Sequence, residues 1–102
     1  MQHVRLAFYH FQAGTTQEAI TKAQAWLLPI FQQQPGFVAY GVVKTEGDTA
    51  VSISVWQTRQ QAEAAVQAAG TWVKEHIGPL VESVHHHVGD LSFMAVSGAL
   101  GA

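Results

Sequence analysis

The chain has 102 residues, 48% of them hydrophobic, and a formal net charge of −2. This length and composition predict one globular domain and exclude a disordered or collagen-like chain. Only five Lys and Arg residues are spread along it, which argues against binding to nucleic acid, where many cations must meet phosphates. Because the chain has no cysteine, disulfides, thiolate nucleophiles and cysteine-ligated metal centres are excluded.

The N-terminal sequence MQHVRL lacks the charged and then apolar build of a signal peptide. No apolar run approaches the roughly 18 residues that a membrane span needs. We therefore expect a cytoplasmic protein that has no membrane partner.

The first strand and the first helix show two different periodicities. Residues 3–12 alternate with period two and place large apolar side chains on both faces of a strand. Thr15 and Glu18 have the spacing of a capping box, and apolar residues then recur every three or four positions. This pattern predicts a helix over residues 16–31, with a bend at Pro29.

Two β-rich runs follow and predict a hairpin. Residues 37–45 and 49–56 flank Glu46, Gly47 and Asp48, and the glycine supplies the backbone freedom that a short loop needs. A hairpin at this place makes the two strands antiparallel neighbours.

A second helix should start after the hairpin. Thr58 and Gln61 repeat the capping-box spacing and predict an alanine-rich helix over residues 59–69, which Gly70 should interrupt. A short helical segment over residues 71–77 follows.

The C-terminal part of the chain predicts one more strand. Residues 81–96 are β-rich, and we expect Gly89 and Asp90 to form a bulge in the middle of this strand. The small residues 97–102 predict a flexible tail, so the folded domain is expected to span residues 1–96.

The order strand, helix, strand, strand, helix, strand is that of ferredoxin-like domains. It predicts an α+β fold of the βαββαβ type, in which both helices cover one face of a four-stranded antiparallel sheet. Since the strands are apolar on both sides, the other face should pack against a second copy of the chain. We therefore expect a homodimer formed through the open sheet face.

Three segments resemble a known family. They are PGFVAYGVV (35–43), SISVWQTRQQAEAA (52–65) and WVKEHIGPLVESV (72–84), and they are similar to antibiotic-biosynthesis monooxygenase domains of the dimeric α/β-barrel superfamily. The resemblance covers residues 3–96. It implies a dimeric α/β barrel and, among the activities of the family, the cofactor-independent oxygenation of aromatic phenols.

The heme-degrading branch of this family has an Asn on the first strand, a Trp in the second helix and a His in the segment that follows. In this chain, Tyr9 and His10 stand where the Asn would fall, and the position of the Trp falls near Ala65. Only His76 lies close to the family's His, so the resemblance does not extend to heme cleavage, although His76 could in principle serve as an axial ligand.

His76 is the candidate catalytic residue. It follows Trp72 by four positions, so the two side chains should stack on one helical face, at the mouth of the space between helices and sheet. An imidazole titrates near neutral pH and can take a proton from a phenol. The alternative interpretation is a structural residue at the edge of the core.

Trp72, Tyr9, Tyr40 and His10 are the candidate substrate-binding residues, because aromatic side chains can line a pocket for a flat aromatic ligand. The same residues could instead be packed in the core or at a dimer interface. Trp56 is interpreted as a packing residue.

Three consecutive histidines lie in the predicted last strand. Alternation along a strand sends His85 and His87 to one face and His86 to the other, together with Val84 and Val88. Two histidines on one face could share a metal, but a tight site needs further ligands. We therefore expect these histidines to line the sheet face or the dimer interface.

The expected function is the binding, and the oxygenation, of a small aromatic or phenolic molecule, with no metal and no organic cofactor. In such a reaction a base removes the phenol proton and the substrate anion itself reduces oxygen. The alternative is a noncatalytic dimeric binding or stress-related module. A heme-degrading oxygenase and a metal-binding protein are further alternatives.

Overall fold

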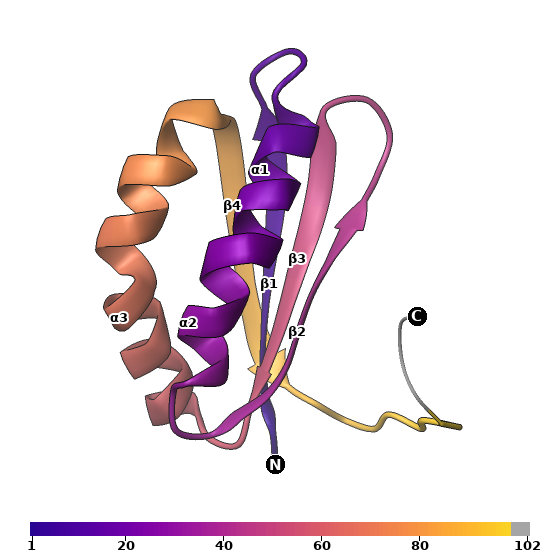
Figure 1. Ribbon diagram of the computed structural model, residues 1–102. Helices are drawn as coiled ribbons and strands as arrows, with labels where there is room; N and C mark the ends of the chain where they lie inside the picture. Colours follow the sequence, from indigo (N-terminus) through magenta and orange to yellow (C-terminus); the bar gives the residue numbers. More distant parts are fainter. Residues whose placement is uncertain (99–102) are drawn as a thin grey trace.

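The computed structural model describes residues 1–98 and confirms the predicted ferredoxin-like α+β fold (Figure 1). The strands are β1 (His3–Phe11), β2 (Phe37–Lys44), β3 (Thr49–Trp56) and β4 (Val81–Asp90). The helical segments are α1 (Thr16–Lys22), the π-helical turn η1 (Ala23–Leu27), α2 (Leu28–Gln32), α3 (Arg59–His76) and the 3₁₀ turn η2 (Gly78–Leu80).

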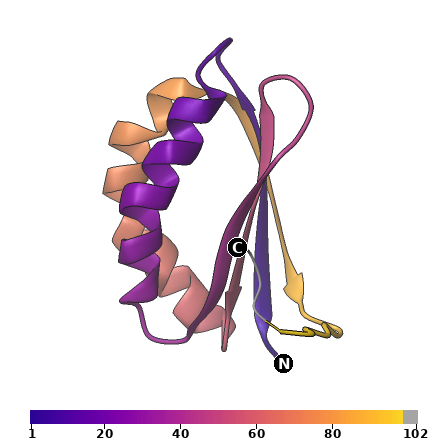
Figure 2. The ribbon, with the colours of Figure 1, turned by 45° about the vertical axis from the view of Figure 1, so that its right-hand side comes forward.

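The four strands form one antiparallel sheet in the order β2-β3-β1-β4. Both helical layers lie on the same side of this sheet, and the opposite face is left open, as Figure 2 shows. The first helical layer runs continuously through α1, η1 and α2, and the second is α3. The two sets of helices therefore cover one face of a single sheet.

The strand register assigns each side chain of β1 to a face. Ala7 and Phe11 are buried under the helices, and alternation places His3, Arg5 and Tyr9 on the same face. Three intervening residues of β1 lie on the open face: Val4, Phe8 and His10. Phe8 is 42% exposed there, so the open face retains accessible apolar surface in a single chain.

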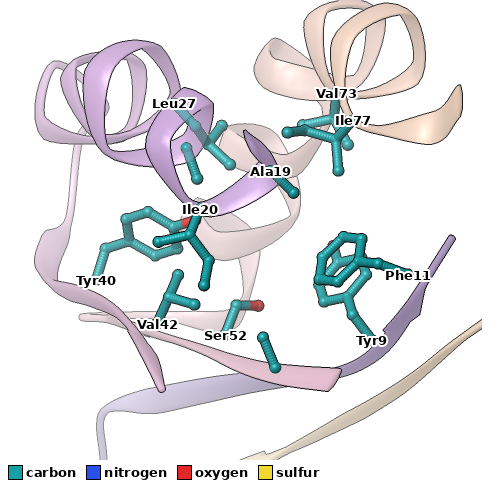
Figure 3. A pocket seen from close by; sticks show the side chains of 12 residues that line it. Tyr9, Phe11, Ala19, Ile20, Leu27, Tyr40, Val42, Ser52, Val73 and Ile77 are labelled. Atoms are coloured by element: carbon teal, nitrogen blue, oxygen red, sulfur yellow. The ribbon is translucent and has the colours of Figure 1, made fainter. Parts of the chain in front are cut away.

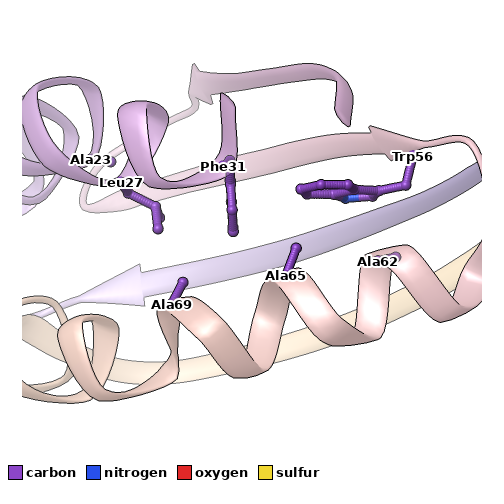
Figure 4. Close-up of a cluster of buried hydrophobic side chains, with 7 residues drawn as sticks. All are labelled: Ala23, Leu27, Phe31, Trp56, Ala62, Ala65 and Ala69. Carbon is purple, nitrogen blue, oxygen red and sulfur yellow. The ribbon is translucent and has the colours of Figure 1, made fainter. Parts of the chain in front are cut away.

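The core beneath the helices centres on Trp56, which is completely buried. Phe31 and Phe37 meet its ring edge-on, with ring centroids 5.4 and 5.6 Å away. Small residues on α3 let this helix approach closely, and Figure 4 shows them facing Leu27, Phe31 and Trp56: Ala62, Ala65 and Ala69. The interpretation of Trp56 as a packing residue agrees with this burial.

The predicted capping box at Thr15 does not form. The Thr15 side chain makes no capping hydrogen bond to α1; its hydroxyl donates instead to the Gln12 carbonyl, at 2.8 Å. The neighbouring Thr16 hydroxyl donates to Asp48 Oδ1 at 2.9 Å, and the Gly14 N–H donates to the same oxygen at 3.2 Å. Asp48 of the β2–β3 hairpin thus orders the start of α1, a tertiary contact that the local spacing could not reveal.

The predicted bend near Pro29 is a widened turn. The π-helical turn η1 lies directly before α2, in whose first turn Pro29 sits. A proline ring would clash with the carbonyl four residues earlier in a regular helix, and a π turn relieves that conflict.

The capping hydrogen bond predicted at Thr58 is confirmed, because Thr58 Oγ1 accepts from the Gln61 N–H at 3.1 Å. The predicted interruption at Gly70 is wrong, since α3 continues through it to His76. A glycine inside a helix costs only about 1 kcal/mol relative to alanine, and packing of α3 on the sheet offsets that cost.

The last strand is shorter than predicted. β4 ends at Asp90, so Gly89 and Asp90 close the strand and do not form a bulge in its middle. The Leu91 N–H donates to the Gln2 carbonyl, and beyond Leu91 the chain leaves the sheet. Phe93, in this last segment, is 89% exposed. Part of the predicted flexible tail, residues 99–102, lies outside the described residues.

Candidate functional site

A cavity of about 470 Å³ lies between α3 and the helix-facing side of the sheet. This volume falls within the roughly 300–1,000 Å³ of ligand pockets. Its polar wall groups are few: Arg5, Tyr9, Tyr40, Ser52, Ser54, Lys74 and His86. The remaining lining is mostly aliphatic and aromatic: Leu6, Ala7, Leu27, Phe31, Val66, Ala69, Gly70, Val73, Ile77, Gly78, Val81 and Val84.

A smaller apolar pocket of about 30 Å³ adjoins this cavity under α1 and shares Tyr9 and Tyr40 with it. Figure 3 shows both tyrosines rising from the sheet toward the helices, with Ser52 between them. Tyr9 stacks on Phe11 at a centroid distance of 5.3 Å, and Tyr40 meets the edge of Phe31 at 5.0 Å. These contacts hold the two rings as one wall of the site.

The two tyrosine hydroxyls are suited to donate hydrogen bonds. Burial raises the pKa of Tyr40, and the neighbouring Tyr9 raises it further. Burial also raises the pKa of Tyr9, although the Arg5 charge opposes part of this rise. Both hydroxyls therefore stay protonated at neutral pH, when each can donate to a ligand oxygen.

His86 supplies a titratable base to the cavity. It lies on the helix-facing side of β4, opposite Ala7 of β1. Partial burial lowers the pKa of His86, and the positive charge of Arg5 lowers it further. The imidazole is therefore neutral at pH 7 and has a nitrogen free to accept a proton.

Trp72 and His76 stack as predicted, with ring centroids 5.1 Å apart and ring planes 27° from parallel. Neither residue lines the cavity. The cavity side of α3 is a helical stripe at three- and four-residue spacing: Val66, Ala69, Gly70, Val73, Lys74 and Ile77. His76 lies outside this stripe and is exposed, and its carbonyl accepts from Lys22 Nζ at 3.4 Å.

The structure therefore brings together only part of the predicted site. Tyr9 and Tyr40 line the cavity, whereas His10 lies on the open face opposite Thr49 and Ser83. His76 was expected at the mouth of this space, but it is not among the residues that line the cavity. Its catalytic role stays a prediction that this position does not favour.

The triple histidine divides between the faces as predicted. His86 faces the helices, and His85 and His87 face the open side, where the His87 ring meets Phe8 edge-on at 5.5 Å. Within residues 1–98, no group of three or more His, Cys, Asp or Glu side chains is placed to hold a metal ion. Alternation along the strand correctly predicted that His86 shares a face with Val84 and Val88. His86 was not among the site residues predicted from the sequence.

Arg5 and Lys74 are the other residues that sequence reasoning missed. Arg5 lies in an otherwise apolar strand, and Lys74 lies in the last turn of α3, where a basic side chain is commonly a helix-end feature. Only the tertiary structure, in which α3 packs against β1 and β3, shows that both line one cavity.

Within the part of the chain that the structure describes, no helix is both long and apolar enough to cross a membrane.

Comparison with curated proteins finds no match.

Among solved structures, the fold is similar to a variant of SnoaB, a cofactor-independent oxygenase from Streptomyces nogalater. The TM-score is 0.78 and the identity 18%, over 91% of this chain and 95% of that one. A Nitrosomonas europaea protein named for antibiotic biosynthesis monooxygenases has a TM-score of 0.77 at 15% identity, over 90% and 91% of the two chains. A Shewanella oneidensis protein has a TM-score of 0.72 at 23% identity, over 86% and 88%. At these identities the likeness establishes the fold.

The sequence itself gives the family. The profile of the Antibiotic biosynthesis monooxygenase family matches residues 2–71, which include β1, the first helical layer, the β2–β3 hairpin and most of α3. The match spans more than half of the chain and includes both tyrosines of the cavity wall. The chain therefore belongs to the antibiotic biosynthesis monooxygenase family.

Proposed function

We propose that this protein is a cofactor-independent monooxygenase that oxidises an electron-rich phenol held in the cavity between α3 and the sheet. The observation that carries this proposal is a cavity of about 470 Å³ with mostly apolar walls and two tyrosine hydroxyls. Such a space suits a flat ring system of two or three rings, whose polar groups need only a few partners. Family membership supports the same class of reaction.

The reaction needs no redox group on the protein if the substrate itself reduces oxygen. A phenol that loses its O–H proton becomes a phenolate, which can pass an electron to O₂. The resulting phenoxyl radical and superoxide combine at a ring C–H carbon ortho or para to the oxygen, and loss of that hydrogen with cleavage of the O–O bond gives a quinone and water. One oxygen atom enters the product and the other leaves as water, so atoms and electrons balance.

His86 is the base that the cavity offers for the first step. Its neutral imidazole lines the cavity, as a proton acceptor must, whereas His76 does not. Tyr9 and Tyr40 would donate hydrogen bonds to the substrate oxygens, and the apolar walls would exclude water from the phenolate.

We further propose that two copies pack through the open sheet face to form a homodimer. Phe8 on β1 and Val43 on β2 are 42% and 51% exposed on this face. Exposed apolar side chains on two strands of one sheet face favour contact with a complementary surface, and a second copy offers the same surface by symmetry.

Oxygen consumption tests the proposed activity. The purified protein is incubated with a panel of naphthols and hydroxyanthracenes, and O₂ uptake and quinone absorbance are followed. We expect turnover that His86→Gln lowers by about 100-fold, the usual contribution of a general base. The matched variant His76→Gln should retain the rate of the wild type. Ligand binding without O₂ uptake across the panel would instead favour the noncatalytic binding module.

A further inference from the structure

We propose that the cavity selects aromatic ligands that carry a carboxylate, which Arg5 and Lys74 bind from opposite walls. This inference rests on the proposed function for the aromatic nature of the ligand and adds its charge. The first observation is the sign of the lining. Arg5, Lys74 and His86 line the cavity, and within residues 1–98 no Asp or Glu lines it.

This concentration of positive charge is local. The chain has five Lys and Arg residues and a net charge of −2, yet two of the five cations line the same cavity. An acidic protein with a basic cavity attracts an anion to that cavity in particular, because low-dielectric walls strengthen the field inside it.

The second observation is that, within residues 1–98, these two cations have no internal partner. Lys22 pairs with Glu18 and Arg59 with Glu63. Lys44 donates to two loop carbonyls. Among the described residues, the remaining cations, Arg5 and Lys74, make no ion pair and no side-chain hydrogen bond: they are the two that line the cavity.

The neighbours of Arg5 explain why its charge stays available. Ser54 of β3 and Val88 of β4 lie beside it in the sheet, so no carboxylate stands directly opposite. Asp90 lies two residues farther along β4, opposite His3, and forms no ion pair with Arg5. The charge of Arg5 acts electrostatically on Tyr9 and His86, which both line the cavity, so it would also act on a ligand bound there.

The two cations differ in what they can hold. Arg5 projects from the sheet floor and is half-buried, and its planar guanidinium can donate two parallel hydrogen bonds to a carboxylate. Lys74 projects from α3, the facing wall, and is exposed, so its ammonium suits the outer oxygen of the same group. A ligand would place its rings against Tyr9 and Tyr40 and its carboxylate toward this cationic side.

Isothermal titration calorimetry on the full chain tests the proposal with matched ligands at pH 7. The probes are 2-naphthol, 6-hydroxy-2-naphthoate, its neutral methyl ester, and 6-methoxy-2-naphthoate, which has the carboxylate but no phenol. We expect both carboxylates to bind about 10- to 100-fold more tightly than the naphthol and the ester, the range for a hydrogen bond to a charged group.

Variants separate the cavity cations from total charge. Arg5→Gln and Lys74→Gln should each remove most of the preference for the carboxylates, whereas Arg59→Gln, which removes one exposed charge from the Glu63 pair, should leave it intact. Arg5→Lys should restore part of the preference. Circular dichroism and melting temperature identify a variant that fails to fold, and Lys74→Gln, at an exposed position, keeps the test valid if Arg5→Gln unfolds.

The outcomes distinguish this proposal from the proposed function. Equal affinity for 2-naphthol and 6-hydroxy-2-naphthoate would overturn the carboxylate preference and leave oxygenation of phenols standing. A bound 2-naphthol that ionises at pH 7, and does so only when Arg5 is present, would show that the cations serve a phenolate and would also overturn it. Tight binding of both carboxylates without O₂ uptake from any phenol would support the preference and contradict the oxygenase.

Discussion

Arg5 on β1 and His86 on β4 line the same cavity from adjacent strands, close enough for the guanidinium charge to act on the imidazole. Partial burial is the larger cause of the lowered pKa of His86, and Arg5 adds to it. We therefore predict that His86 titrates below 6.5 in the folded chain and that Arg5→Gln moves its pKa upward. NMR titration of the imidazole signals, assigned with His86→Gln, measures both values.

The sign of the accompanying stability change follows from linkage. Between the lowered pKa of folded His86 and the ordinary value near 6.5, the unfolded chain binds more protons than the folded chain. Stability contributed by neutral His86 is thus present above pH 6.5 and is lost as the pH falls through this window. Denaturant unfolding of the wild type and of His86→Gln from pH 5 to 8 should show a weaker pH dependence in the variant.

The two tyrosines of the cavity wall should ionise unusually late. Burial raises the pKa of Tyr40 and of Tyr9, and the chain contains only these two tyrosines. In an alkaline titration, the absorbance of the phenolate band should therefore increase with a midpoint above the ordinary value near pH 10. Tyr9→Phe leaves the signal of Tyr40, and Tyr40→Phe leaves that of Tyr9. A midpoint at 10 in either variant, with the fold intact by circular dichroism, would contradict the burial of the remaining hydroxyl.

Much of the fold was accessible from the sequence because each strand and helix carries its own period. The alternation over residues 3–12 predicted β1 as a strand, and the hairpin loop at Gly47 predicted that β2 and β3 are antiparallel neighbours. The end of β4 was not accessible in this way. Residues 91–96 are as apolar as a strand, but they lie beyond the N-terminal end of β1, and Leu91 makes the last backbone contact, with Gln2.

The site was harder to predict than the fold because it depends on the rotation of α3. The spacing of Trp72 and His76 correctly gave their stacking but not the direction in which the pair points. Since the helix runs through Gly70 without a break, the stripe that starts with Ala62 and Ala65 continues to Val73 and leaves His76 outside it. A break at Gly70 would have allowed a different rotation.

Substitutions at two glycines with positive φ should distinguish the cost of backbone strain from the cost of steric crowding. Gly14 has a φ of +77° and open space around it, whereas a side chain on Gly36, with a φ of +81°, would overlap Gln61 Oε1. Gly14→Ala should therefore cost about 1–2 kcal/mol, the usual penalty of the left-handed region, and Gly36→Ala should cost more. Chemical denaturation measures both. Adding Gln61→Ala to Gly36→Ala removes the crowding but not the strain, so the double variant should lose about as much stability as Gly14→Ala. Equal losses of stability in Gly14→Ala and Gly36→Ala would contradict the crowding at Gly36.

The proposed dimer gives a prediction at Phe8, which lies on the open face against His87. Phe8→Glu places a charge in the proposed interface and should convert a dimer into a monomer, measured by sedimentation at micromolar protein. Trp26→Glu is the matched control, because Trp26 is 63% exposed and belongs to η1 in the helical layer. A wild-type monomer, or a dimer that only Trp26→Glu dissociates, would place the interface elsewhere or remove it.

The same interface should respond to pH through the histidines of the open face: His10, His85 and His87. The charged form of an imidazole is disfavoured when a second sheet removes water from it. The dimer should therefore weaken as the pH falls from 8 to 5. The double variant His85→Gln and His87→Gln, which keeps polar side chains of similar reach, should reduce this change. An unaltered pH response in that variant would show that the proton-sensitive group lies outside this pair.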